Sequence, residues 1–278
     1  MIKIILIITL TLNLYAKERI ITLSPSLNEI IYALGMGEEV VGNTEYCQYP
    51  KETLTIPKVG GYFSPSLEKI ISLNPTVVLM QKNNYKLNRQ LNRLKIKTKI
   101  VKIDRIESIK TSIIELGKLF NKIEPATKIV DKINHSLKSL SGIVNNKKIL
   151  IVFGHNTSLA KNIFVSGKNL YFEDIILASG NRNALESKRE GQPILNMENI
   201  ISTNPDIVIL LAHSMKEKQL TAKELIEPWL KLPISASKSN SIYIEDKEYA
   251  GIPSDRLSLF LRDFKDILID YKKRTSSY

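Results

Sequence analysis

Residues 67–80 read LEKIISLNPTVVLM, and 130 positions later residues 197–210 read MENIISTNPDIVIL. Half of the aligned positions are identical, and most of the others exchange one apolar residue for another. A weaker similarity precedes each copy, between EIIYALG at residues 29–35 and DIILASG at residues 174–180. Because the two similarities occur in the same order in each half, the sequence predicts two related structural units.

Each copy of the stronger repeat predicts a short helix followed by a buried strand. Glu68 and Glu198 would lie in the first helical turn, where the helix dipole favours a carboxylate. The Asn-Pro pair then ends the helix, because the residue before a proline avoids the α region. Residues 77–80 and 207–211 are continuous apolar runs, which are typical of strands buried on both faces of a sheet.

The rest of the chain extends this pattern. Further strands are predicted at residues 19–23, 99–103, 148–153 and 241–244, and helical stretches alternate with them. This alternation predicts an α/β protein with two similar α/β lobes and mainly parallel sheets.

A helical segment lies between the two predicted lobes. Residues 106–140 carry apolar residues at helical spacing, and Pro125 divides them into two helices, since proline is well tolerated at the first position of a helix. We therefore predict an N-terminal lobe over residues 17–124, a single long connecting helix over residues 125–142, and a C-terminal lobe over residues 143–278.

The first sixteen residues, MIKIILIITLTLNLYA, are predicted to be a secretory signal peptide. Their apolar run is shorter than the ~20 residues that span a bilayer, and Ala16 is a small residue at a suitable cleavage point. The alternative is a buried N-terminal strand or helix, but charged residues begin abruptly at Lys17. We expect export to the periplasm.

Composition narrows the class of protein. The 278 residues include 43% apolar and 24% charged residues, which is typical of a folded globular protein. The single Cys47 cannot form an intramolecular disulfide, and we expect it to be a small packed thiol. No G-x-S-x-G turn and no phosphate-binding G-x-x-x-x-G-K-[ST] loop is present, so any ATP hydrolysis must belong to a partner.

Positive charge is in excess, with 40 Lys and Arg against 28 Asp and Glu and a formal net charge of +12. Residues 81–99 hold seven cations and no acid, and we expect them to form a solvated face. The alternative is a basic cleft wall that attracts anionic ligands. Nucleic-acid binding is disfavoured by export and by the lack of aromatic residues interleaved with these cations.

Several segments carry a resemblance to a known family. They are IITLSPS at residues 20–26, ALG at 33–35, VGNTEYCQYP at 41–50, PKVGGY at 57–62 and the Leu67-Glu68 repeat. The mature chain resembles the iron-complex and cobalamin type of substrate-binding protein of ABC importers, most specifically over residues 19–80. The resemblance implies two lobes joined by one backbone helix and a ligand held in the cleft between them.

The resemblance also implies partners. The ligand would be delivered to an ABC permease with its ATPase subunits, by a monomer that contacts the membrane only through the permease. The family docks through one carboxylate from each lobe, set against arginines of the transporter, and Glu68 and Glu198 match these positions. A duplicated glutamate suits a two-fold symmetric partner. Alternatively, each glutamate only stabilises its helix N-terminus, by about 0.3–1 kcal/mol, and the two roles are compatible.

The ligand site is predicted from the fold. In an open α/β sheet, ligands bind beyond the carboxyl ends of the strands. This rule selects the loops around Ser24, Tyr46, Tyr62, Gln81, His155 and His213. Tyr46 and Tyr62 also match positions at which cobalamin-binding members of the family place aromatic rings, although Tyr62 replaces a larger ring there. A tyrosine offers a flat apolar face and a phenolic oxygen, which suits a corrin, a porphyrin or a ferric chelate; a partly buried structural role is the alternative.

Two arginines of the second lobe complete the predicted site. Arg189 and Arg256 could attract an anionic ligand. Arg256 also matches the family's arginine near the start of the last helix, although Asp255 stands where proline is usual.

The sequence does not decide which metal-containing ligand is bound. Two cleft histidines fall short of the three or four ligands that a bare transition-metal ion needs, which favours a chelated metal. A tyrosine or histidine could still be an axial ligand of haem iron. We therefore expect a binding protein without catalytic residues or a cofactor of its own. Its ligand would be an iron siderophore or haem, with cobalamin next. The alternatives are an exported α/β hydrolase and a protein that binds free transition-metal ions.

Overall fold

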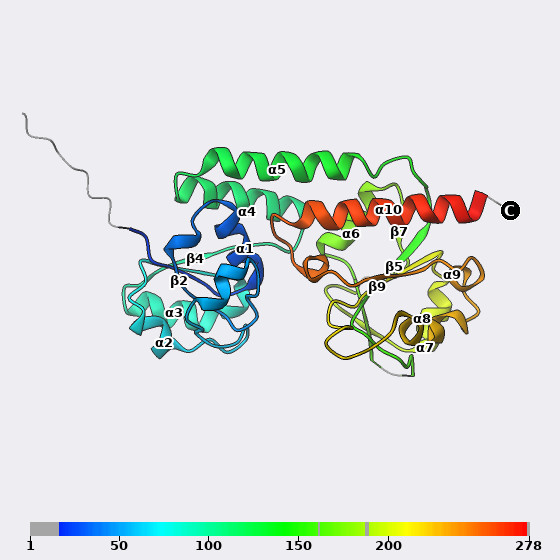
Figure 1. Ribbon diagram of the computed structural model, residues 1–278, viewed down its shortest axis with the longest axis horizontal. Helices are drawn as coiled ribbons and strands as arrows, with labels where there is room; N and C mark the ends of the chain where they lie inside the picture. Colours follow the sequence, from blue (N-terminus) through cyan, green and yellow to red (C-terminus); the bar gives the residue numbers. More distant parts are fainter. Residues whose placement is uncertain (1–16, 161, 187–188, 277–278) are drawn as a thin grey trace, which may run out of the picture.

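The computed structural model describes residues 17–160, 162–186 and 189–276. The predicted signal peptide, residues 1–16, lies outside the described residues. Figure 1 shows two lobes side by side, with a layer of helices along the upper side. These are α4 (Ile106–Leu119), α5 (Ile123–Lys138) and α10 (Leu257–Ser276). Among the described residues, no helix combines the length and the apolar character needed to cross a membrane.

The N-terminal lobe contains a four-stranded, fully parallel sheet in the order β2-β1-β3-β4. Its two central strands are buried, as their apolar sequences predict. The edge strand β4 begins two residues before the predicted position, because the apolar residues that suggested residues 99–103 partly belong to the loop that enters the cleft. The elements of this lobe are β1 (Ile20–Thr22), α1 (Pro25–Ala33), β2 (Val40–Asn43), α2 (Leu67–Ser72), β3 (Val77–Met80), α3 (Tyr85–Arg93) and β4 (Lys97–Ile100), with 3-10 turns at Gly37–Glu39, Lys51–Thr55 and Lys82–Asn84.

The C-terminal lobe contains a sheet in the order β10-β9-β5-β6-β8, with β7 also paired to β5. The pairings of β5 with β9, β9 with β10 and β5 with β7 are parallel, whereas β6 adds antiparallel pairings to β5 and β8. The elements are β5 (Lys148–Phe153), β6 (Ile163–Val165), α6 (Tyr171–Ala178), β7 (Arg182–Asn183), β8 (Ile194–Leu195), α7 (Met197–Thr203), β9 (Ile207–Leu211), α8 (Ala222–Leu230), α9 (Ser235–Lys238), β10 (Ile242–Glu245) and a 3-10 turn at Glu248–Gly251.

The sequence repeat forms the predicted helix, break and strand in both lobes. Ser66 caps α2 and Asn196 caps α7, each accepting a hydrogen bond from the backbone N–H three residues later. Each helix is followed by an asparagine in the left-handed conformation, Asn74 with φ 44° and Asn204 with φ 41°. Asparagine tolerates this conformation better than most residues, and it ends the helix before the proline that follows.

The connecting segment is a layer of helices. Helix α5 begins at Ile123, so Pro125 lies inside its first turn, where a missing N–H costs no helical hydrogen bond. It ends at Lys138, before the predicted end at residue 142, and it packs against both α4 and α10. The boundaries of the two lobes, predicted from the sequence at residues 124 and 143, remain a proposal.

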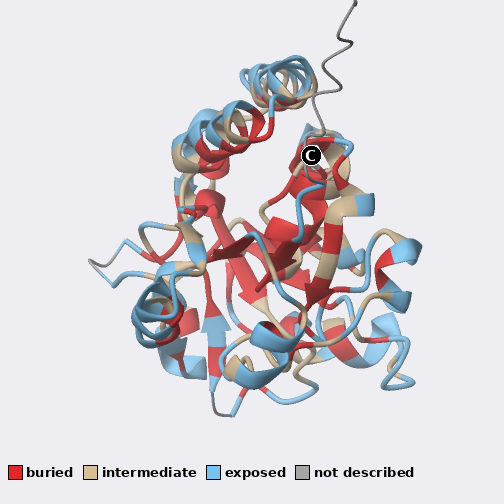
Figure 2. Ribbon diagram, turned by 90° about the vertical axis from the view of Figure 1, so that its left-hand side faces the viewer, coloured by how far each residue is buried: buried red, intermediate tan, exposed pale blue. Residues whose placement is uncertain are grey.

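The largest apolar core runs through both lobes. It joins Ile20 and Leu27 of the N-terminal lobe, Ile113 of α4, and Phe172 and Phe260 of the C-terminal lobe in one cluster of buried side chains. Figure 2 shows most of the strands buried and the outer faces of the surrounding helices exposed, and the edge strand β4 is itself partly exposed. The core therefore fixes how the two lobes face each other.

Cys47 is buried, as expected for a packed thiol. Its sulfur lies 3.3 Å from the Thr44 hydroxyl, and burial raises the pKa of the thiol.

Candidate ligand-binding cleft

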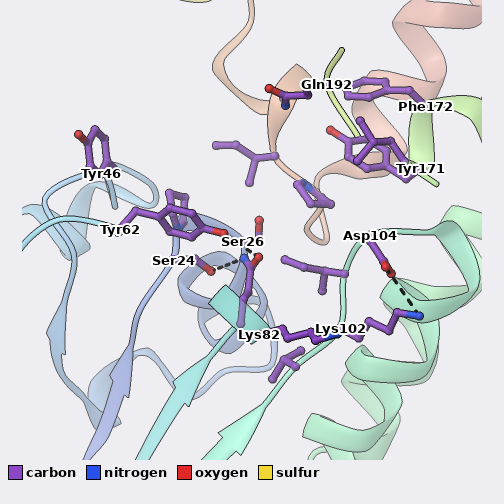
Figure 3. Close-up of a pocket in the computed structure, with 18 of the residues that line it drawn as sticks. Ser24, Ser26, Tyr46, Tyr62, Lys82, Lys102, Asp104, Tyr171, Phe172 and Gln192 are labelled. Carbon is purple, nitrogen blue, oxygen red and sulfur yellow. Dashed lines mark hydrogen bonds and ion pairs between the residues drawn. The ribbon is translucent and has the colours of Figure 1, made fainter. Parts of the chain in front are cut away.

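A cleft of about 1090 Å³ lies between the two lobes. It is lined by the loops that follow β1, β3 and β4 in one lobe, and by the end of β5 and the start of α6 in the other (Figure 3). Its volume lies at the upper end of the range for small-molecule sites, about 300–1,000 Å³. The lining residues include Ser24, Tyr46, Tyr62, Phe63, Gln81, Lys82, Lys102, Asp104, Phe153, Tyr171, Phe172, Gln192, Ile252 and Pro253.

Four of the predicted site residues line this cleft, and three of them are hydrogen-bonded in series. The Tyr62 hydroxyl donates to Gln81 Oε1 at 2.8 Å, and Gln81 Nε2 donates to Ser24 Oγ at 3.1 Å. Ser24 Oγ also accepts from the backbone N–H of Leu27, which caps α1. The Tyr62 ring is thus held in place through Gln81 by Ser24, the residue that caps α1.

Tyr62 presents an apolar face to the cleft. Burial raises the pKa of its phenol, so the hydroxyl keeps the proton that it donates to Gln81. Phe63 packs edge-to-face against it, with ring centroids 4.6 Å apart. Phe63 is 84% exposed and Tyr46 is 63% exposed, and both line the cleft. These rings are available for contact with a ligand.

The opposite wall is built from aromatic residues that the sequence reasoning missed. Tyr171 and Phe172 occupy the first turn of α6, and Phe153 ends β5. Phe172 packs edge-on against both Phe153 and Phe260, each at 5.5 Å between centroids. This packing holds the wall rigid. The adjacent aromatic residues Tyr171 and Phe172 are the feature of the sequence that could have indicated this wall.

The charged groups of the cleft come from the N-terminal lobe. Lys102 pairs with Asp104, the Nζ and Oδ2 atoms being 3.7 Å apart. Lys82 is exposed and has no carboxylate partner among the described residues. Asp104 is the one carboxylate in the lining within the described part of the chain, so the cleft carries a net positive charge.

Arg256 does not line the cleft, contrary to our expectation. Its guanidinium bonds to Glu29 of α1, with Nε 3.0 Å from Oε2, and to Glu248 at 2.7 Å. It also lies 3.7 Å from the centre of the Tyr49 ring. Arg256 and Glu29 are both buried, and each comes from a different lobe. The arginine therefore joins the lobes, and Glu29 neutralises the charge that a ligand would have used.

His155, His213 and Arg189 also lie outside the cleft lining. The cleft meets β5 at Phe153, two residues before His155, so this loop leaves the cleft before the histidine is reached. Burial lowers the pKa of His155, and the nearby charges of Lys218 and His213 lower it further. Across residues 17–160, 162–186 and 189–276, no three or more His, Cys, Asp or Glu side chains gather as a metal site.

A comparison with models of protein families identifies the family of this chain. The model of the periplasmic binding protein family matches residues 20–249, which is most of the chain. The chain belongs to the periplasmic binding protein family. The resemblance found in the sequence and the two-lobed α/β fold are both confirmed.

Individual relatives of this periplasmic binding protein agree with that assignment. The vitamin B12-binding protein of Vibrio campbellii is 25% identical over 241 residues, covering 86% of this chain and 85% of the relative. The high-affinity heme uptake system protein IsdE of Staphylococcus aureus is 26% identical over 231 residues, covering 78% and 75%. The solved periplasmic vitamin B12-binding protein BtuF of Vibrio cholerae superposes with a TM-score of 0.79 over 92% of this chain and 98% of BtuF; at 17% identity this shows the fold.

The two glutamates of the repeat are placed symmetrically on this periplasmic binding protein. Glu68 lies in the first turn of α2 and Glu198 in the first turn of α7, and both are exposed. In Figure 1 the two helices lie on the lower side of their lobes, away from the layer of α4, α5 and α10. Neither carboxylate has a side-chain partner among the described residues. Both are open to an external cation.

Proposed function

We propose that this chain is the substrate-binding protein of an ABC importer and that it carries a metal chelate with a flat ring system. The observation that supports this most directly is the large cleft with an aromatic wall on each lobe. Tyr62 and Phe63 offer accessible rings on one side, on which a planar ligand could stack. Tyr171 and Phe172 are largely buried and back the apolar wall on the other side. Vitamin B12 and haem, named for the two relatives, are both metal-containing tetrapyrroles.

The charge of the cleft favours an anionic chelate. Lys82 offers a cation without a carboxylate partner among the described residues, which suits the carboxylates of haem or of a ferric siderophore. Cobalamin is the second candidate. A bare metal ion fits less well, because a cleft of about 1090 Å³ is far larger than an ion and its few ligand atoms require.

A hydrolase is the less favoured alternative. The cleft serine Ser24 is held by Gln81 and by the first turn of α1, and no histidine is among the described residues that line the cleft. A nucleophile without a base nearby is not activated.

The partners follow from the same proposal. Export by residues 1–16 would place the mature protein in the periplasm, where it acts as a monomer. Glu68 and Glu198 would dock on the permease, and the ATPase subunits would supply the energy of transport.

The test is a titration of the mature protein with haemin, cobalamin and several ferric siderophores, followed by the ligand absorbance spectrum and tyrosine fluorescence. We expect saturable binding of one chelate. Tyr62→Ala should weaken it more than tenfold, about 1.4 kcal/mol, because the ring that faces the ligand is lost. Tyr85→Ala, which removes an exposed ring outside the cleft, is the control. No binding across the panel, or an unchanged affinity in Tyr62→Ala, would contradict the proposal.

A further inference from the structure

One continuous stretch of the N-terminal lobe is basic and lacks acids. Residues 69–103 contain nine Lys and Arg residues and no Asp or Glu. Among the described residues, two of these cations have a carboxylate partner: Lys99 pairs with Glu115 at 2.7 Å, and Lys102 pairs with Asp104 at 3.7 Å. The other cations of this stretch have no described carboxylate to neutralise them.

Helix α3 collects these cations on one face. Leu87 and Leu91 are buried in a core cluster of the lobe, whereas Lys86, Arg89 and Arg93 are exposed. At about 100° of rotation per residue, the three cations lie within about 60° of one another, opposite the two leucines. They form a compact stripe that points into solvent.

The stripe is flanked by apolar side chains. Tyr85, at the start of α3, is 66% exposed, and Leu94, just after its end, is 51% exposed. We call Lys86, Arg89 and Arg93, together with Tyr85 and Leu94, the α3 basic face. Cations beside an exposed tyrosine and leucine are the composition of surfaces that lie against lipid headgroups.

The placement of the α3 basic face suits such a contact. In Figure 1, α3 lies on the lower side of the N-terminal lobe, as does α2 with Glu68, and the layer of α4, α5 and α10 lies on the upper side. If the proposed docking through Glu68 and Glu198 is correct, this lower side faces the permease and therefore the plane of the membrane. None of the five residues lines the cleft, so the ligand does not need them.

We propose that the α3 basic face binds the surface of an anionic phospholipid membrane. This contact would add to the contact through the permease and would keep the protein close to the membrane that holds its transporter. A convex helix face is better matched to a broad layer of phosphate headgroups than to one small anion, which needs a concave site. Tyr85 and Leu94 would enter the headgroup layer. A purely ionic partner has no such layer for apolar side chains.

The test is co-sedimentation of the mature protein with vesicles of phosphatidylglycerol and phosphatidylcholine, compared with vesicles of phosphatidylcholine alone. We expect binding to the anionic vesicles only, and loss of this binding at about 1 M salt, where charges are screened beyond ~3 Å. The triple variant Lys86→Gln, Arg89→Gln and Arg93→Gln should bind about a hundredfold more weakly, at about fivefold for each cation.

The matched control removes the same charge from the opposite side. Lys118, Lys138 and Lys272 are exposed on α4, α5 and α10, and their joint replacement by Gln should leave most of the vesicle binding intact. Both variants should keep the melting temperature and the chelate affinity of the unchanged protein, which separates this proposal from the function of the cleft. No binding to anionic vesicles would overturn it, as would equal losses in the two triple variants. Retention on heparin without binding to vesicles would also overturn it.

Discussion

Glu245 shows how a single buried carboxyl group makes stability depend on pH. It ends β10, is 6% exposed, and accepts a hydrogen bond from the Lys247 N–H at 3.1 Å. Burial is the main cause that raises its pKa, and the charges of Asp263 and Asp246 also raise it, whereas Lys247 lowers it; together they bring the pKa from 4.5 to about 6. The folded protein therefore holds this proton more tightly than the unfolded chain does. The contribution of this carboxyl group to the free energy of unfolding is fully present below pH 4.5 and is lost as the pH rises through about 6.

We predict that Glu245→Gln stabilises the protein at pH 7.5 by about 2 kcal/mol and leaves its stability at pH 4 unchanged. The amide oxygen can still accept from Lys247, but no charge has to be buried at the higher pH. Urea unfolding at a series of pH values measures this. Glu217→Gln, at an exposed position, is the control and should show no such difference. Equal gains at both pH values would show that ionisation of Glu245 is not the cause.

The sequence predicted one half of the cleft better than the other. Ser24 and Gln81 closely follow the buried strands β1 and β3, so the rule for parallel sheets placed them beside one another. Tyr62 comes from the long segment after β2 and bonds to Gln81. Arg256 could not be assigned in this way. Its partner Glu29 is 227 positions away in the chain, and no local pattern reveals a pair of that kind.

At the scale of elements, α2 and α7 are the units that the repeat predicted best. Their caps, their glutamates in the first turn and their left-handed asparagines all follow from local sequence. The C-terminal lobe also contains the antiparallel strands β6 and β8, which are three and two residues long. Such short strands carry too little periodicity to be predicted, since at least four residues are needed to show alternation.

We predict that Glu68→Ala together with Glu198→Ala abolishes ligand uptake while the affinity for the ligand stays the same. The two carboxylates lie outside the cleft and are open to cations of the permease. Uptake by cells in which each variant is the sole binding protein for the importer measures the first effect, and titration measures the second.

The control pair for this prediction is Glu107→Ala with Glu124→Ala. These glutamates occupy the same first-turn position in α4 and α5, on the upper side in Figure 1. They occupy the same position relative to the helix dipole and also pair with Lys110 and Lys128. Surface pairs of this kind contribute little, so a difference in uptake between the two double variants reports docking. Normal uptake by the Glu68 and Glu198 double variant, or weakened ligand binding in it, contradicts the assignment.

For the whole molecule, two ion pairs hold the lobes together. Arg105 at the start of α4 donates from Nε to both oxygens of Asp174 in α6, each at 2.8 Å, and the Ile106 N–H also donates to Asp174. Glu29 and Arg256 form the second, buried pair. With the helical layer and the shared core, these pairs favour a fixed spacing of the lobes.

We predict that Arg256→Met destabilises the protein by about 3–5 kcal/mol, because it leaves Glu29 buried without its partner. Adding Glu29→Gln to that variant should restore most of the loss, since no lone charge then remains. Thermal and urea unfolding measure both. Lys128→Met, which breaks the exposed pair with Glu124, should change little. A double variant as unstable as the single one would mean that packing, and not charge, explains the loss.

The core that runs through both lobes has a consequence for incomplete chains. Phe260, Phe264 and Leu268 of α10 belong to the same buried cluster as Ile20 and Leu27, near the start of the described residues. A product that stops before α10 leaves the apolar surfaces that this helix covers in contact with water, and an open, partly packed chain is cut readily by proteases. We therefore expect a chain that lacks α10 to be degraded faster than one that carries it.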